Sequence, residues 1–301
     1  MQTDQARSVR LCTAEIAAMK GATLLELMLA LLISTLILSG LITVYLAMQT
    51  VNQTQVALTT IQENCRAART LLSFDIKMAG YAGCAKLRKY YPINYSAAFS
   101  LTNANKIQSY HSAAMKAGSA ALTVRHAAGK NAVLIKSMKN YSLLYTSAAP
   151  RFYRGDLLYL SDCSNAELFI VKDLIRENNG IQKILAERPL HTLYKENAEV
   201  SEFNINTYFV GQTARRNANG AVIYALYRQD IKLHKTELIE GIDDMKVKYN
   251  FLENGQLYEL TEAEVNDWSK VVGISIMLTL SALNSVSLQK NEYIYVSLRS
   301  L

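Results

Sequence analysis

Residues 20–29 read KGATLLELML and begin the stretch of sequence that decides the fold. From Leu27 to Gln62 the chain has 36 consecutive residues without Asp, Glu, Lys, Arg or His. Between Leu27 and Met48 only isolated Ser, Thr and Gly residues interrupt the apolar side chains. Because about 20 apolar residues cross a bilayer as a helix, the sequence predicts a single membrane-spanning helix over residues 22–50.

The charges on the two sides of this stretch predict its orientation. Arg7, Arg10 and Lys20 precede it, whereas the first Lys or Arg after it is Arg66. Positive charges stay on the cytoplasmic side, so we expect a cytoplasmic N-terminus and an exported remainder. The main alternative is a cleaved secretory signal, but its apolar region normally holds about 7 to 15 residues and ends at a small-x-small site. This stretch is longer and no such site follows it.

Overall composition agrees with one apolar helix joined to an ordinary domain. The chain has 301 residues, a formal net charge of +7, 50% hydrophobic residues and 19% charged residues. These values argue against a disordered chain and against a membrane protein with many spans. A modest positive charge of this size does not by itself predict a nucleic-acid partner.

Glu26 places a carboxylate at the edge of the apolar helix. An ionisable group at membrane depth costs several kcal/mol unless it is paired, so Glu26 is a candidate functional residue. A cut between Gly21 and Ala22 would create an amino terminus that could pair with it. The alternative is an ordinary single-span anchor with an interfacial glutamate.

This string resembles the type III signal of type IV prepilins and pseudopilins. The resemblance implies cleavage after Gly21 by a prepilin peptidase, methylation of Ala22, and a Glu26 that neutralises the amino terminus of an adjacent subunit. Residues 1–21 would then be a cleaved leader. The chain departs from the usual pattern in having Ala22 where Phe is common and in lacking a proline within the apolar segment.

After the membrane the apolar residues recur every three or four positions. They are Leu58, Ile61, Cys65, Ala68, Leu72, Ile76 and Ala79. This spacing predicts that residues 51–79 form the amphipathic half of the same helix, ending at Gly80.

Residues 80–301 change to alternating apolar and polar runs that predict an exported, mostly antiparallel β domain. The clearest strand covers residues 272–280, and residues 293–298 are expected to pair with it. Asn254-Gly255 reads as a hairpin turn, and residues 261–264 read as a capping box that opens a short helix. The predicted fold class is α+β and pilin-like, with a long N-terminal helix packed on a large sheet domain.

Several blocks beyond the signal resemble the PilW family of type IV pilus minor pilins. They are residues 75–84, 155–163, 226–228, 240–249 and 296–299. The resemblance implies a protein that joins other minor pilins and the major pilin and primes pilus assembly. It also implies the pilus tip as a candidate location. It also implies residence in the bacterial inner membrane before assembly and on the pilus or cell surface afterwards.

The cysteines predict one disulfide in the processed chain. Cys12 would leave with the leader, and Cys65 falls on the apolar stripe, where a small thiol packs well. Exported domains favour disulfides, which leaves Cys84 with Cys163. The PilW-like blocks carry the same two residues. The alternatives are a pair that includes Cys65, or free thiols.

No enzyme, cofactor or metal site is predicted. The four histidines are scattered and lack the spacing of zinc ligands, and no nucleophile or phosphate-loop motif is complete. A basic aromatic run at residues 86–91, with Arg215, Arg216 and Lys232, could contact nucleic acid. We interpret it as a solvated face, so nucleic acid is not an expected partner.

Two other classes of function stay open on sequence grounds. A minor pseudopilin of a type II secretion system would share the signal and the helix. An exported adhesin or DNA-binding module would bind a ligand without being needed for piliation.

Overall fold

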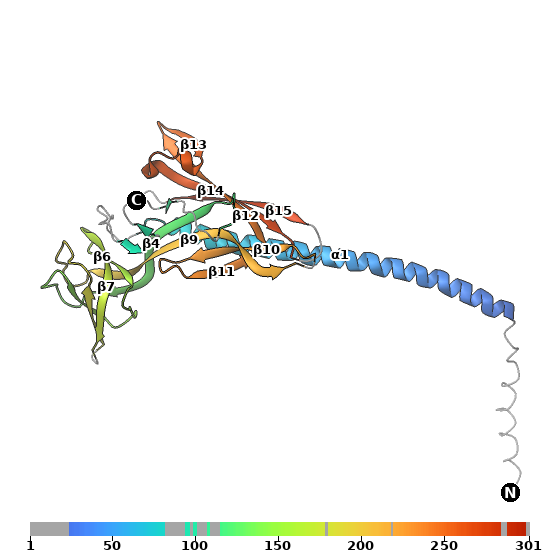
Figure 1. Cartoon of the computed structure of the whole chain (residues 1–301), viewed down its shortest axis with the longest axis horizontal. Helices are drawn as coiled ribbons and strands as arrows, with labels where there is room; N and C mark the ends of the chain where they lie inside the picture. The colour runs from blue at the N-terminus through green and yellow to red at the C-terminus, as the bar shows by residue number, and fades with distance from the viewer. Residues whose placement is uncertain are drawn as a thin grey trace, which may run out of the picture. The chain divides into compact units, whose positions relative to one another are not determined.

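The structure is a computed structural model, and it describes residues 24–81, 94–96, 99–100, 107–108, 115–177, 180–217, 219–283 and 288–298. The chain divides into two compact units, residues 1–56 and residues 57–301. In the described residues one helix, α1 (Leu24–Met78), is followed by fifteen strands and two short 3₁₀ helices. Figure 1 shows this order of elements. The fold is α+β, as predicted.

The second half of α1 packs on the sheets through the predicted stripe. The buried apolar residues of this helical half are Ala57, Ile61, Cys65, Ala68, Leu72 and Ile76. The one difference lies at the start, where Ala57 is buried and Leu58 is 40% exposed. Gly80 follows with a φ of 76°, a backbone conformation that favours glycine and ends helices. Its amide donates to the Arg125 carbonyl at 2.8 Å.

Nine strands form the larger sheet. They are β3 (Ile107–Gln108), β4 (Ala121–Val133), β5 (Leu143–Ser147), β6 (Leu157–Ser161), β7 (Ala166–Arg176), β8 (Ile181–Ala186), β9 (Glu199–Arg216), β10 (Val222–Gln229) and β11 (Lys235–Glu240). The path runs β11-β10-β9-β6-β7-β8-β5, and β4 pairs with both β3 and β9. All described pairings are antiparallel.

The long strand β9 connects three apolar clusters. Val200 belongs to a cluster around β5 to β8, Phe203 and Ile205 to a small cluster beside β6, and Tyr208 and Val210 to the cluster that buries α1. These clusters follow one another along a single strand. The packing of the helix is therefore continuous with the packing of the distal strands.

A separate four-stranded sheet has the order β13-β12-β14-β15. Its strands are β12 (Ile242–Glu253), β13 (Gln256–Leu260), β14 (Val271–Ser281) and β15 (Gln289–Ser297). The predicted pairing of the last two strands is confirmed, with Ile276 opposite Ile294. The remaining two strands, β1 (Asn94–Ser96) and β2 (Phe99–Ser100), pair with each other.

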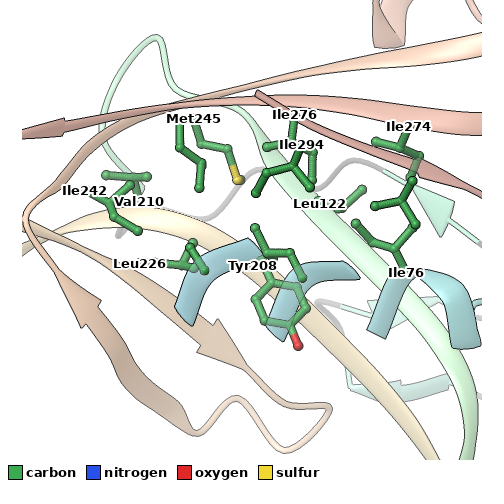
Figure 2. Close-up of a cluster of buried hydrophobic side chains, with 14 of the residues drawn as sticks. Ile76, Leu122, Tyr208, Val210, Leu226, Ile242, Met245, Ile274, Ile276 and Ile294 are labelled. Carbon is green, nitrogen blue, oxygen red and sulfur yellow. The ribbon is translucent and has the colours of Figure 1, made fainter. Parts of the chain in front are cut away.

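The helix-facing cluster joins both sheets to α1. Figure 2 shows side chains from the four-stranded sheet, such as Met245 and Ile276, above Tyr208 and Leu226 of the larger sheet and Ile76 of α1. Full burial of one such aliphatic side chain stabilises a fold by about 1.5–3 kcal/mol. This cluster is the physical basis for holding residues 57–79 on the β domain.

The predicted hairpin turn at residues 254–255 and the predicted capping box at residues 261–264 are both present. Asn254 and Gly255 have φ values of 50° and 79°, as a two-residue hairpin between β12 and β13 requires. The capping box is present, with Glu264 accepting from the Thr261 amide at 2.7 Å. The short helix that it opens is a 3₁₀ helix of three residues, Glu262–Glu264, and a second 3₁₀ helix covers Trp268–Lys270.

Candidate functional site

The first half of α1 exposes its side chains over the residues that the structure describes. Every residue from Leu24 to Gln53 is exposed, including all the large apolar side chains. By length and composition the helix could cross a membrane. Such an N-terminal helix indicates membrane anchoring or export.

Several hydroxyl side chains in this half are bonded to carbonyls of the same helix. The hydroxyls of Thr35 and Ser39 donate to the carbonyls of Leu32 and Leu36, each at 2.8 Å, and Thr43 donates to the Ser39 carbonyl at 2.9 Å. Hydroxyl side chains bonded in this way offer little unpaired polarity to their surroundings. The segment can therefore behave as an apolar surface despite these residues.

Glu26 lies in the first turn of α1 and is exposed. A carboxylate in this position is favoured by the partial positive charge of the helix N-terminus. Gly21 and Ala22 lie outside the described residues, so cleavage and methylation there stay predictions. The structure places the predicted assembly residue at the beginning of the exposed apolar helix.

The packed half of α1 carries a buried carboxylate that the sequence analysis did not single out. Asp75 is only 7% exposed. Its Oδ1 lies 3.0 Å from His126 Nε2 on β4, while its Oδ2 accepts from Asn206 Nδ2 at 3.0 Å and from the Tyr208 hydroxyl at 2.8 Å on β9. This four-residue cluster, the Asp75 cluster, bonds the helix to two neighbouring strands.

The geometry around His126 indicates a charged imidazole. Its Nδ1 lies 2.9 Å from the Ala127 carbonyl oxygen, and its Nε2 faces the Asp75 carboxylate. Both neighbours are acceptors, so both ring nitrogens bond well only when both carry a proton. Asp75 and His126 therefore form a buried ion pair.

The pKa values of the pair agree with that charge state. Burial alone would raise the pKa of Asp75, but hydrogen bonds from His126, Asn206 and Tyr208 hold it below its usual 3.8. Burial alone would lower the pKa of His126, but the bonds to Asp75 and the Ala127 carbonyl raise it above 6.5. Each partner keeps the other ionised.

This pair predicts a pH window for the stability of the β domain. The His126 contribution is complete below the unfolded-state pKa and is lost as pH rises through the raised folded-state pKa. The Asp75 contribution is complete above the unfolded-state pKa and is lost as pH falls through the lowered one. We therefore expect the unfolding free energy to fall as pH rises above 6.5, the ordinary pKa of histidine, and through the raised folded-state pKa of His126, measured by denaturant titration of the full chain in detergent.

Replacement of His126 by Gln should remove most of that slope. The matched control is His234→Gln, because His234 is exposed and pairs with Asp230 at 3.2 Å. A slope that His126→Gln leaves intact would contradict the charged state assigned to this ring.

A second buried carboxylate holds a loop in the distal part of the domain. Glu167 accepts from the backbone amides of His191 at 2.7 Å and Thr192 at 2.9 Å, and from the Tyr194 hydroxyl at 3.3 Å. These donors all lie in the segment between β8 and β9. Glu167 therefore has a structural role.

Among the described residues, no group of three or more His, Cys, Asp or Glu side chains is arranged to hold a metal ion. His126, His191 and His234 each lie beside a single carboxylate, and His111 lies outside the described residues.

The cysteines occupy different environments. Cys65 is a free thiol on the buried face of α1, as the apolar stripe predicted, and burial raises its pKa. Cys163 lies in the turn between β6 and β7 and is disulfide-bonded. Cys84 lies outside the described residues, so its pairing with Cys163 stays a prediction.

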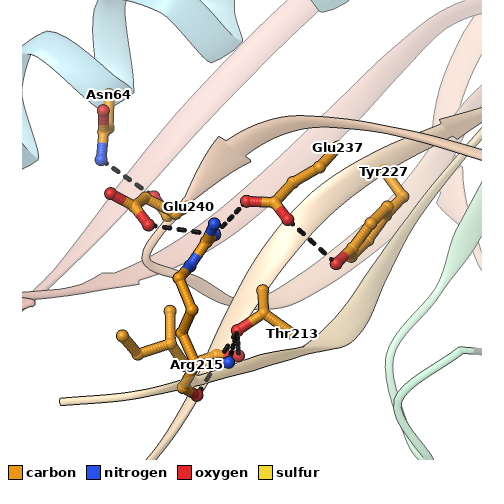
Figure 3. A network of polar contacts seen from close by, with 7 residues as sticks. Asn64, Thr213, Arg215, Tyr227, Glu237 and Glu240 are labelled. Atoms are coloured by element: carbon orange, nitrogen blue, oxygen red, sulfur yellow. Dashed lines mark hydrogen bonds and ion pairs between the residues drawn. The ribbon is translucent and has the colours of Figure 1, made fainter.

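The basic residues considered as a nucleic-acid surface are engaged in local contacts. Figure 3 shows the Arg215 guanidinium between Glu237 and Glu240, with Glu237 also accepting from the Tyr227 hydroxyl. In the same view Asn64 of α1 donates to the Glu240 carbonyl at 2.9 Å. Lys232 pairs with Asp156 at 2.7 Å, and residues 86–91 lie outside the described residues.

Comparison with protein-family models, with curated proteins and with solved structures found no match. The architecture itself defines a class. A long N-terminal helix, apolar and exposed at its beginning and packed at its end on antiparallel sheets, is pilin-like. It is the arrangement of a type IV pilin or pseudopilin-like protein.

Proposed function

We propose that this chain is a minor pilin that takes part in type IV pilus biogenesis, where it joins other minor pilins to prime assembly and is located at the pilus tip. The observation that carries the proposal is α1, whose exposed apolar half begins at Glu26 and continues into a half packed on the β domain. The PilW-like blocks of sequence support the more specific role.

In this proposal the unprocessed chain waits in the inner membrane with its N-terminus in the cytoplasm. A prepilin peptidase cuts between Gly21 and Ala22, and Ala22 is methylated. The chain then leaves the bilayer and packs its apolar helix among the helices of other subunits. An unpaired carboxylate is costly in that apolar core, so Glu26 neutralises the amino terminus of an adjacent subunit.

The Asp75 cluster, near the C-terminal end of α1, is consistent with this extraction because it bonds the helix to the β domain. Extraction of a helix from lipid transmits its load to the domain that is attached to it. The buried ion pair, together with the Gly80 and Tyr81 backbone bonds to β4, fixes residues 57–79 to the sheet. The domain and residues 57–79 of the helix can then move together into the filament.

A deletion strain tests the proposal against its two alternatives. Loss of surface pili on imaging, with normal secretion and with piliation restored by the wild-type chain, is the expected result. Loss of secretion with normal pili would identify a minor pseudopilin. Normal pili and normal secretion with loss of surface or DNA binding would identify an exported module, and either of these two results would overturn the proposal.

A further inference from the structure

The edge strand β15 has the features of a strand that accepts another strand. It runs for nine residues and pairs with β14 in unbroken register from Gln289 to Ser297. Proteins usually protect such an edge with a bulge, a proline, or a short or charged strand. β15 carries two charged residues, Lys290 and Glu292, but it has no bulge and no proline, whereas the edge strand β11 has a register shift.

The alternation of hydrogen bonds along β15 shows which of its residues direct their backbone groups away from β14. Leu298 donates its amide to the Val272 carbonyl at 2.8 Å, and in an antiparallel ladder alternate residues bond to the same neighbour. The even-numbered residues of β15 therefore bond to β14. The backbone groups of Asn291, Tyr293, Tyr295 and Ser297 face outward, and within the described part of the chain no strand pairs with them.

The side chains of these edge residues lie on the outer face of the sheet. Tyr293 and Tyr295 are 69% and 62% exposed, whereas Ile294 and Val296 are buried on the face toward α1. Two exposed tyrosines beside unpaired backbone groups are typical of a protein contact, because tyrosine is enriched at interfaces.

The opposite edge of the same sheet is β13, and there too the residues whose backbone groups face outward have side chains on the outer face. The two-residue turn at Asn254-Gly255 makes Glu253 and Gln256 a hydrogen-bonded pair. The backbone groups of Leu257 and Glu259 therefore face away from β12, and among the described strands none pairs with them. Leu257 is 56% exposed opposite the exposed Leu252, so its side chain also lies on the outer face.

We propose that the free edge of β15 accepts the β13 edge of a second copy of this chain, so that the four-stranded sheets of neighbouring copies continue into one another. The edge residues of both strands place their side chains on the outer face, so pairing keeps the outer faces together and sets Leu257 against the exposed tyrosines. If the outward-facing backbone groups of one edge had belonged to residues with inward side chains, pairing would have placed the outer face of one sheet beside the inner face of the other.

Orientation also favours this pairing over pairing of two β15 strands. Arg69 of α1 pairs with Glu292 of β15. Further along the helix, Ile76 lies beside Ile274, which is opposite Val296 (Figure 2). Thus β15 runs alongside residues 57–78 of α1 in the same direction. In two copies whose helices point the same way, the two β15 strands are parallel, so they cannot pair antiparallel. The strands β13 and β15 lie at opposite edges of an antiparallel sheet with an even number of strands, so they run in opposite directions. The β13 strand of one copy can therefore pair antiparallel with the β15 strand of the other.

This inference rests on the proposed function, because that function gives all copies one orientation in the membrane and the filament. The repeated contact is head to tail and does not close on itself.

Cysteine cross-linking in cells tests the contact with the full chain. Two tagged forms are produced together, one with Leu257→Cys and the other with Asn291, Tyr293, Tyr295 or Ser297 replaced by Cys in turn. A disulfide requires Cα atoms roughly 4.4–6.8 Å apart, so we expect an oxidised product that carries both tags for the edge residues in register. The matched control is Tyr258→Cys, which is 44% exposed on the neighbouring position of β13 but has the opposite phase.

A several-fold higher yield with Leu257→Cys than with Tyr258→Cys supports the inference. Equal yields, no mixed product, or a product made only of two Tyr293→Cys chains would overturn it. Processing of the chain is measured in the same cells. A processed chain that does not cross-link contradicts the sheet contact alone, whereas an unprocessed chain contradicts the proposed function and leaves the cross-linking result readable.

Discussion

Replacement of Asp75 by Ala should lower the unfolding free energy of the β domain by about 3–5 kcal/mol, the usual cost of removing one partner of a buried ion pair. The substitution leaves the His126 imidazolium and the Asn206 and Tyr208 donors buried without their shared acceptor. It also removes the polar bonds that join α1 to β4 and β9. We therefore expect the largest loss of stability from any single change at an ionisable residue of α1.

Trp268 provides the measurement, because it is the only tryptophan in the sequence. Its ring packs edge-on against Tyr249 in the helix-facing cluster, with 4.8 Å between the ring centroids. Its fluorescence during denaturant titration of the full chain in detergent reports unfolding of this cluster. Glu63→Ala is the matched control, since Glu63 is exposed on α1 and its loss should cost no more than about 0.5 kcal/mol. A loss in Asp75→Ala no greater than in this control would show that the Asp75 cluster does not hold the helix.

Replacement of Glu26 by Gln should leave cleavage intact and prevent incorporation into filaments. Gln has nearly the same size and shape as Glu, so the segment recognised by the peptidase is little changed. The lost charge removes the partner of a neighbouring amino terminus, which would then be buried unpaired in an apolar core at a cost of several kcal/mol. We expect the processed variant to accumulate in the membrane and to be depleted by more than about tenfold from sheared filaments, as a cost above 1.4 kcal/mol implies.

The measurement compares the variant in membrane and filament fractions by immunoblot with an internal tag. Glu63→Gln is the control, because it makes the same chemical change on the same helix beyond the uncharged segment. Wild-type recovery of Glu26→Gln in filaments would contradict the role assigned to the carboxylate.

The helix and the class of fold could be predicted because their signals are local. An uncharged run followed by a stripe at three- and four-residue spacing identifies one amphipathic helix without reference to other parts of the chain. The predicted strands over residues 272–280 and 293–298 correspond to β14 and β15 for the same reason, since the first of them alternates regularly between apolar and polar residues.

The strands β8, β11 and β13 have weaker patterns in the sequence. β8 alternates, but one of its buried positions is Gln182, whose amide bonds to the carbonyls of Ser147 and Pro150. A polar residue there hides the apolar face. β13 and β11 are edge strands with mostly exposed side chains, so hydrophobic periodicity has little to detect.

Asp75 was missed as a site residue although a signal was present. It lies three residues after Leu72 and four before Ala79, on the face that the stripe assigns to the core. A carboxylate on such a face must have partners. The identity of those partners could not follow from sequence, because His126 and Tyr208 reach it from strands that only the tertiary fold brings together.

The N-terminal residue of the chain recovered from cells with an active prepilin peptidase tests the central claim most directly. Intact-mass and peptide analysis of the wild-type chain should find a mature protein that begins at Ala22 and carries one methyl group on its amine. The Gly21→Val variant, with a branched side chain at the cleavage site, should retain residues 1–21. A wild-type chain that keeps its leader, or that is cut at any other position, would contradict the assignment to the pilin class.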